Sequence, residues 1–110
     1  MKQRDLDAFH TIREMCEAII VDTKLLSFEE FQGNRSVFDA TMWRITIIGE
    51  AANRVSAEIY EQHAGFTLKP AISMRHRIVH GYDTVDDVSV YRVATLDIPN
   101  LLAELDKRGL

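Results

Sequence analysis

The fold is decided by residues 38–59, FDATMWRITIIGEAANRVSAEI. Apolar residues recur in this stretch at three- and four-residue steps, which places their side chains on one face of an α-helix. They are Phe38, Met42, Ile45, Ile48, Ala52, Val55 and Ile59. The stripe predicts one long helix that begins near Asn34 or Ser36, runs to about His63 and is stopped by Gly65.

Two further strips on this predicted helix indicate two neighbours for it. Trp43 and Ile47 form a second apolar strip, and a helix that is apolar on two sides usually has two surfaces to bury. Gly49, Ala52 and Ser56 keep another strip small, so that a second backbone can approach it closely. We therefore expect another backbone to pack closely on the small strip and a second copy of the chain to cover the apolar one.

The rest of the chain also has helical periodicity. An amphipathic pattern predicts a helix over about residues 3–25, and Ser27 with Glu30 has the spacing of a capping box for one short turn. Pro70 suits the first turn of a third helix, which we expect Gly81 to stop.

A last helix is predicted from a cap at Asp86. Pro99 should kink or break this helix, because a proline there clashes with the carbonyl oxygen of Thr95. No segment has the sustained alternation that is typical of a β-strand. The sequence therefore predicts an all-α fold, an up-and-down bundle of four main helices that occupies residues 1–110 as a single domain.

Composition narrows the classes of function. The formal net charge of -4 argues against sequence-blind wrapping of nucleic acid, which usually needs a basic face, so any contact with nucleic acid must be local. The single cysteine, Cys16, cannot form an intrachain disulfide, which fits a reducing compartment. The charged N-terminus does not resemble a secretory signal, and no apolar run reaches the roughly 18 residues of a membrane span. We expect a cytoplasmic protein without a membrane segment.

The candidate chemistry is concentrated in residues 74–82, MRHRIVHGY. His76 and His80 are four residues apart and share a helix face, whereas Arg75 and His80 are about 140° apart on a straight helix. Arg75 and His80 can act on one small ligand in two ways. Either the helix ends before His80, or the site combines side chains from two copies of the chain.

An arginine and a histidine suit the cleavage of RNA phosphodiester bonds. A histidine titrates near neutral pH and can take the proton of a 2′-hydroxyl or protonate the leaving oxygen. An arginine can grip the phosphate with two hydrogen bonds and stabilise the added negative charge of the transition state. The plain alternative is that the arginines are solvated and the histidines cap the end of the helix.

The histidine pair also has the spacing of two metal ligands. Arg77, however, stands where the common zinc motif has a glutamate after the first histidine, His76. A third ligand would have to come from Asp83, Asp86 or Asp87. Because an arginine opposes a bound cation, we expect no metal and no other cofactor.

Glu50 and Arg54 are four residues apart on the second predicted helix, in the order that favours an ion pair. On the surface such a pair contributes only about 0.3–0.5 kcal/mol. Covered by a partner, it would become a partly buried positioning element.

Residues 75–82, RHRIVHGY, resemble the motif of the HepT-like branch of the HEPN superfamily: an arginine, four residues, a histidine, one residue and a tyrosine. Residues 48–52, IGEAA, are similar to the isoleucine-glycine-glutamate-alanine signature of the same family. The likeness covers essentially the whole chain and continues through Arg4-Asp5, FEEF at 28–31 and IPNL at 98–101.

The resemblance implies a fold, an activity and partners. HepT-like proteins are small all-α homodimers and metal-independent endoribonucleases, which act as toxins beside a nucleotidyltransferase of the MNT type. By this resemblance Arg75 would bind and polarise the phosphate and His80 would be the general acid or base, both in a cleft at the dimer interface. His76 stands where the family most often has asparagine or aspartate. Substrate binding would be supported by His76, Arg77, Glu50 and Arg54.

Tyr82 matches the tyrosine of the motif. In some systems of this family the antitoxin transfers adenylate from ATP to that tyrosine, and negative charge beside Arg75 would then compete with the phosphate of RNA. A half-buried packing tyrosine is the alternative. For the whole chain, the alternatives are a non-catalytic helical subunit that binds a nucleotide or partner and regulates a nucleotidyltransferase, or a nucleotide-binding bundle without turnover.

Overall fold

Helices are the only regular structure in the computed structural model, which describes residues 1–110. The elements are α1 (Gln3–Thr23), α2 (Phe28–Gly33), α3 (Arg35–Ala52), α4 (Ala57–Gln62), α5 (Lys69–Gly81), the 3₁₀ turn η1 (Tyr82–Thr84), α6 (Asp87–Arg92), the π-helical turn η2 (Val93–Asp97) and α7 (Ile98–Arg108). The all-α fold with four long helices, α1, α3, α5 and α7, is confirmed. None of the helices combines the length and the apolar character that a membrane span requires.

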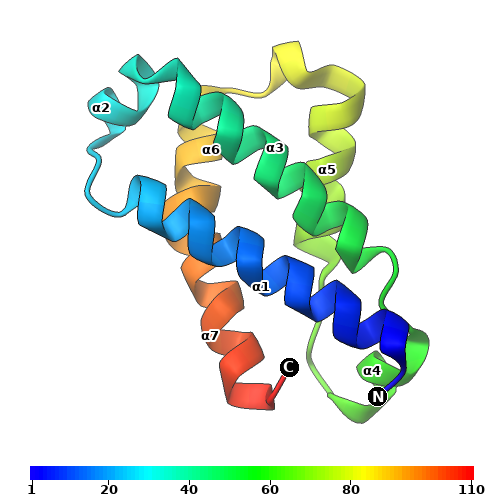
Figure 1. Cartoon of the computed structure of the whole chain (residues 1–110). Helices are drawn as coiled ribbons and strands as arrows, with labels where there is room; N and C mark the ends of the chain where they lie inside the picture. The colour runs from blue at the N-terminus through cyan, green and yellow to red at the C-terminus, as the bar shows by residue number, and fades with distance from the viewer.

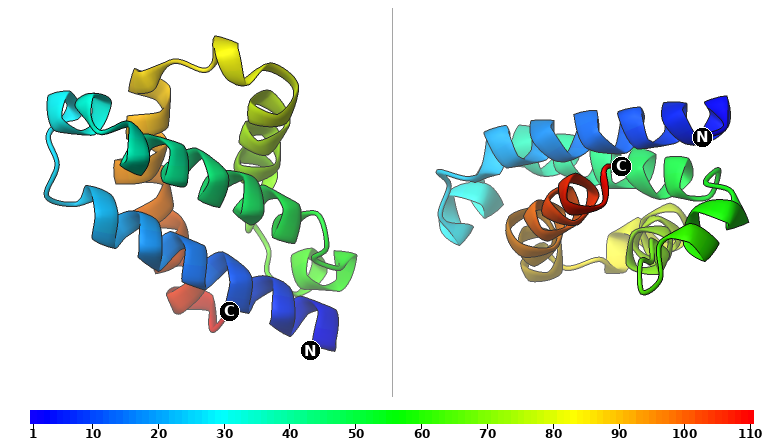
Figure 2. Two further views of the ribbon diagram at one scale, coloured as in Figure 1. Left: turned by 45° about the horizontal axis from the view of Figure 1, so that its top comes forward. Right: turned by 90° about the horizontal axis from the view of Figure 1, so that it is seen from below.

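Helix α3 lies at the centre of the arrangement. It runs beside α1 in the opposite direction, and α5 packs against its other side (Figure 1). The segment from α6 to α7 passes behind α1, so that α1 and α3 form one layer and α5 and α7 the other (Figure 2). Buried side chains from all four long helices fill the space between the layers, among them Ile12, Ile45, Met74 and Leu105. Each such side chain contributes about 1.5–3 kcal/mol by leaving water.

The expected single helix to His63 is wrong, because the chain turns at residues 53–56 between α3 and α4. The carboxylate of Asp5, at the start of α1, accepts hydrogen bonds from the backbone N–H and the hydroxyl of Ser56, both at 2.7 Å. In a continuous helix that N–H would instead donate to the carbonyl of Ala52. A contact between distant parts of the chain therefore ends α3, and the local apolar stripe contains no sign of it.

The Asp5 carboxylate is buried and ionised. Burial raises its pKa, but the hydrogen bonds from Ser56, together with the positive charges of Arg4 and Lys2, outweigh burial and lower the pKa below its ordinary value. Arg4 also donates from Nε to the carbonyl oxygen of Arg54, at 2.9 Å. The first turn of α1 thus holds the connection between α3 and α4 in place.

The local signals at helix ends are largely confirmed. The Ser27 hydroxyl accepts from the Glu30 N–H at 3.1 Å, and the Glu30 carboxylate accepts from the Ser27 N–H at 3.0 Å, which completes the capping box. Asp86 caps α6 by accepting from the N–H of Ser89 at 2.7 Å. Gly65, with φ of 83°, stops no helix, since it lies in the loop after α4.

The interruption expected at Pro99 takes the form of a wider turn. Pro99 lies in the first turn of α7, and η2 immediately precedes it. Proline has no N–H to donate to the carbonyl four residues earlier, and a π-helical turn accommodates such a loss without ending the helix. The segment from α6 through α7 consequently remains continuous (Figure 1).

We predict that Asp5→Ala destabilises the protein by about 3 kcal/mol, because it removes both acceptors of Ser56 and leaves a buried N–H without a partner. Chemical denaturation monitored by circular dichroism measures this. The matched control is Asp7→Ala on the exposed side of the same turn, which should change the free energy of unfolding by less than about 0.5 kcal/mol.

The wild-type protein should have a larger free energy of unfolding than Asp5→Asn near neutral pH, and acid should abolish this difference. Because folding lowers the pKa of Asp5, its contribution is complete above the ordinary aspartate pKa of about 3.9. It is lost as the pH falls through the lowered value of the folded chain. A stability difference between the two proteins that does not change with pH would contradict the assigned role.

Candidate active site

Helix α5 carries most of the candidate site and is continuous from Lys69 to Gly81, with Pro70 in its first turn. The alternative in which the helix ends before His80 is therefore wrong. On one continuous helix, Arg75 and His80 are about 140° apart and point in different directions. A single copy of the chain does not direct both side chains at one phosphate.

Arg75 lies where α5 packs against α3 and is half-buried. Its Nε is inaccessible and has no hydrogen-bond partner in the chain. Its terminal nitrogens form no hydrogen bond or ion pair and are not buried. Other arginines are neutralised by carboxylates, namely Arg13, Arg35, Arg44 and Arg108. Arg75 is thus a part-buried positive charge that is free to bind an anion.

His76 and His80 lie side by side near the end of α5, as the spacing predicted. Their ring centroids are 4.5 Å apart, the ring planes are inclined by 49°, and both residues are exposed. Neither forms a salt bridge with a carboxylate. The two imidazoles can therefore reach a substrate that approaches this face of α5.

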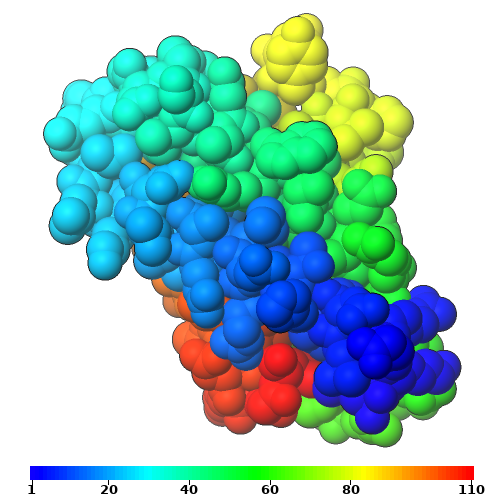
Figure 3. All heavy atoms as spheres, in the orientation of Figure 1, coloured from blue at the N-terminus to red at the C-terminus, as the bar shows by residue number.

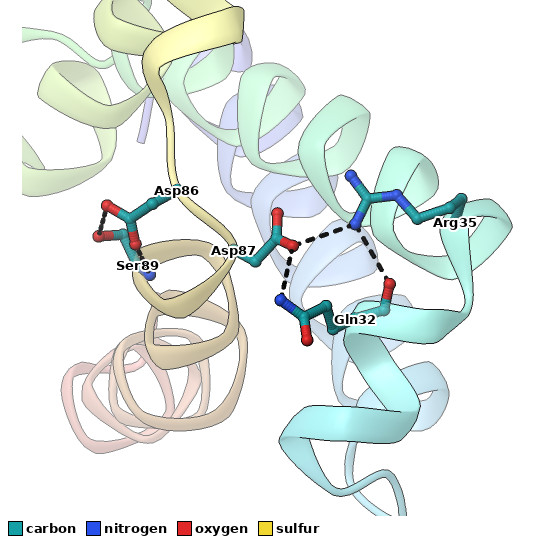
Figure 4. Close-up of polar contacts among 5 residues, drawn as sticks. All are labelled: Gln32, Arg35, Asp86, Asp87 and Ser89. Atoms are coloured by element: carbon teal, nitrogen blue, oxygen red, sulfur yellow. Dashed lines mark hydrogen bonds and ion pairs between the residues drawn. The ribbon is translucent and has the colours of Figure 1, made fainter.

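Two of the three carboxylates considered as a third metal ligand, Asp86 and Asp87, have other partners. Asp86 accepts from Ser89, and Asp87 accepts from Arg35 at 3.3 Å and from Gln32 at 3.2 Å (Figure 4). No group of three or more His, Cys, Asp or Glu side chains is placed to hold a metal ion. Asp86 instead caps the start of α6. Asp87 connects the same turn to Gln32 at the end of α2 and Arg35 at the start of α3.

Arg77 is exposed and lies three residues before His80, about 60° from it around α5 and about 160° from Arg75. It lines a cavity of about 490 Å³ between α3, α5 and α7, whose walls are formed mainly by apolar side chains. Hydrogen bonds from Ser89 are the main cause that lowers the pKa of Asp86, and the positive charge of Arg77 adds to them. Within one chain Arg77 is therefore a neighbour of His80 on α5, whereas Arg75 points away from both.

Glu50 and Arg54 do not form the expected pair. Helix α3 ends at Ala52, so Arg54 is outside the helix and the spacing of four residues no longer brings the side chains together. Both residues are exposed, and no ion pair joins them. Arg54 contributes only backbone groups: its carbonyl oxygen accepts from Arg4, and its N–H donates to the carbonyl oxygen of Ala51 at 3.0 Å.

Three large side chains, one each on α3, α5 and η1, are exposed. They are Trp43 on α3 (66% exposed), Val79 on α5 (47%) and Tyr82 in η1 (71%). The η1 turn projects at one end of the molecule (Figure 3, yellow). The half-buried packing role considered for Tyr82 is therefore wrong for the single chain. In the expected second apolar strip Trp43 is exposed, whereas Ile47 is partly buried by the chain itself.

Comparison with known proteins identifies the family. The sequence profile described as "Ribonuclease HepT-like" matches residues 7–108. This chain belongs to the HepT-like ribonuclease family. A Methanocaldococcus jannaschii protein, provisionally named an RNase, is 32% identical over 108 residues, which cover 97% of this chain and 89% of that protein. A "Probable ribonuclease HepT" of Thermococcus cleftensis is 27% identical over 107 residues, 97% of each chain. No solved structure matches the chain.

Membership in the HepT-like family confirms two expectations. The class of activity is that of an endoribonuclease, so RNA is the class of substrate. The matched region includes every candidate site residue, from Glu50 to Tyr82.

Two features of this HepT-like ribonuclease were not predicted from its sequence. One is the cavity beside Arg77, whose walls come from α3, α5, η2, α7 and the loop before α5. The other is the isolated Nε of Arg75. Neither has a local sequence signal, because both depend on how α5 packs. The small residue Gly49 did indicate a close approach to α3, and that approach is confirmed.

Proposed function

We propose that this HepT-like ribonuclease is the toxin of a toxin–antitoxin pair. Its 110 residues form one cytoplasmic domain that cleaves RNA, without a metal ion or other cofactor, in a cleft between two copies of the chain. The observation that carries the proposal is the free, part-buried charge of Arg75 on the same helix as the exposed His80.

His80 is the general acid or base of the proposed reaction. As a base it takes the proton of the ribose 2′-hydroxyl, whose oxygen attacks the adjacent phosphorus. The 5′-oxygen leaves and is protonated, so that the products are a 2′,3′-cyclic phosphate and a new 5′-hydroxyl end. Arg75 binds the phosphate and stabilises the negative charge of the transition state. Single-stranded or loop RNA is the expected substrate, since its nucleotides can enter a cleft.

A homodimer resolves the angular problem on α5. Arg75 and His80 of one copy diverge by about 140°, but Arg75 of the partner subunit can meet His80 of the first across a two-fold axis. Exposed Trp43 and Val79 supply apolar surface for such an interface.

The remaining site residues have supporting roles in this proposal. His76 shares the face of His80 and contributes hydrogen bonds to the substrate, and Arg77 provides a further positive charge. Glu50 and Arg54 are exposed and unpaired within the chain, which leaves them free to contact RNA or the second copy.

Tyr82 is the proposed point of control by an MNT-type nucleotidyltransferase antitoxin. Its exposed phenolic oxygen can attack the α-phosphorus of ATP, with pyrophosphate as the leaving group. The attached adenylate would place a negative charge in the cleft, where it competes with RNA for Arg75.

We predict that Arg75→Ala lowers kcat for RNA cleavage by about 10²–10³-fold and that His80→Ala lowers it by about 10²–10⁴-fold. The first change removes charge stabilisation and the second removes proton transfer. Cleavage of a fluorescent RNA by the purified variants measures both effects.

Matched controls are His10→Ala and Arg92→Ala, which alter exposed residues on α1 and α6 and should retain activity. EDTA should not change the rate. Full cleavage by both folded Arg75 and His80 variants would show that these two residues are not catalytic. A folded wild-type protein that cleaves no RNA would favour the non-catalytic regulatory subunit. Inhibition by EDTA that zinc reverses would favour a metal enzyme.

A homodimer is expected at micromolar concentration, and Trp43→Glu should convert it to a monomer with much lower activity. Sedimentation velocity measures the mass. Leu25→Glu, which changes an exposed apolar residue just after α1, is the matched control and should remain dimeric. A wild-type monomer that cleaves RNA at full rate would disprove the shared cleft.

Co-expression with the product of the neighbouring gene should add the mass of one adenylate, about 329 Da from the loss of pyrophosphate by ATP, to the wild-type chain but not to Tyr82→Phe. Intact-mass spectrometry reads this directly, and Tyr91→Phe is the matched control. Expression of the toxin alone should arrest growth. If co-expression relieves this arrest while the wild-type chain stays unmodified, the antitoxin inhibits by binding alone.

A further inference from the structure

Gly49 is a point of very close approach between α3 and α5. A Cβ atom placed on Gly49 would lie 2.3 Å from the Cβ of Arg75 and 2.8 Å from the carbonyl oxygen of Ala71. Neither neighbour can move by a change of rotamer, because one is backbone and the other is attached directly to it. Any larger residue at position 49 therefore has to displace α5 itself.

The space left by the missing side chain of Gly49 also determines the direction in which the Arg75 side chain extends from α5. The Cδ of Arg75 would lie 3.2 Å from that Cβ, so the aliphatic part of the side chain passes over Gly49. Nε is sealed from solvent and has no acceptor, whereas the terminal nitrogens are accessible and unpaired. A guanidinium can bind a phosphate through Nε and one terminal nitrogen or through both terminal nitrogens. In Arg75 only the edge formed by the two terminal nitrogens is available.

We infer that Gly49 is a positioning residue for Arg75 and that the guanidinium binds the RNA phosphate through its two terminal nitrogens. This inference rests on the proposed function and specifies the binding mode at its site. Gly49 touches no substrate, and its role is to let α5 approach closely enough for Nε to be covered.

The first experiment compares Gly49→Ala with Gly33→Ala. A Cβ on Gly33 would meet nothing within 4 Å, so this variant controls for the general effect of alanine in a helix. Gly49→Ala should displace Arg75 by about 1 Å and lower kcat by about 10²-fold, while KM for RNA changes little. Gly33→Ala should keep the wild-type kcat. A folded Gly49→Ala protein, verified by circular dichroism, with wild-type kcat would overturn the inference.

The second experiment uses the wild-type protein and does not require that Gly49→Ala folds. Arginine side-chain NMR should show slower solvent exchange for the Arg75 Nε–H than for that of the exposed Arg92. Titration with inorganic phosphate should shift the terminal-nitrogen resonances of Arg75 and leave its Nε resonance nearly unchanged. Fast exchange of the Arg75 Nε–H, or an Nε shift as large as that of the terminal nitrogens, would overturn the inference.

The two readouts separate this inference from the proposed function. If the wild-type protein cleaves no RNA, the proposed function fails, but the exchange rate and the phosphate shifts still test the placement of Arg75. If cleavage depends on Arg75 and His80 but Gly49→Ala is folded and fully active, the function stands and the positioning role of Gly49 is wrong.

Discussion

Close contact between α3 and α5 at Gly49 sets the geometry of the candidate site. The missing side chain lets the backbone of α5 lie against α3, and the Cβ of Arg75 lies at the point of contact. A glycine in the middle of a helix costs about 1 kcal/mol of helix propensity relative to alanine. The packing of α5 against α3 offsets that cost, and the burial of Nε leaves Arg75 with a single usable edge. The position of the positive charge is thus a consequence of helix packing.

Helix α3 can serve as this support because contacts from other parts of the chain hold both its ends. At its C-terminal end, Asp5 captures the N–H of Ser56 and turns the chain toward α4. At its N-terminal end, Arg35 and Gln32 bind Asp87, which anchors the segment that follows η1 (Figure 4). The acceptor in both contacts is a carboxylate, and Asp87 is paired with the charged Arg35; hydrogen bonds that involve a charged group are stronger than those between neutral groups. The first contact holds the chain where it passes from α3 to α4, and the second holds it where it passes from η1 to α6.

Charge explains how an acidic protein can act on RNA. The chain has a formal net charge of -4, and carboxylates neutralise several of its arginines. Arg75 has no such partner, and the two histidines of the same helix are exposed. The favourable potential for a phosphate is therefore local rather than spread over a face, which suits the recognition of one phosphodiester group more than the wrapping of a long strand.

Periodicity and capping chemistry in the sequence by themselves determined the all-α class, the capping box at Ser27, the cap at Asp86 and the shared face of His76 and His80. The family motif selected Arg75, His80 and Tyr82 as candidates. Only the tertiary structure decided that α3 ends at Ala52, that Glu50 and Arg54 do not pair, and that α5 continues past His80. The difference has one physical reason. Spacing along the chain governs contacts within a helix, whereas a bond such as that between Asp5 and Ser56 joins residues 51 apart and exists only once the helices have packed.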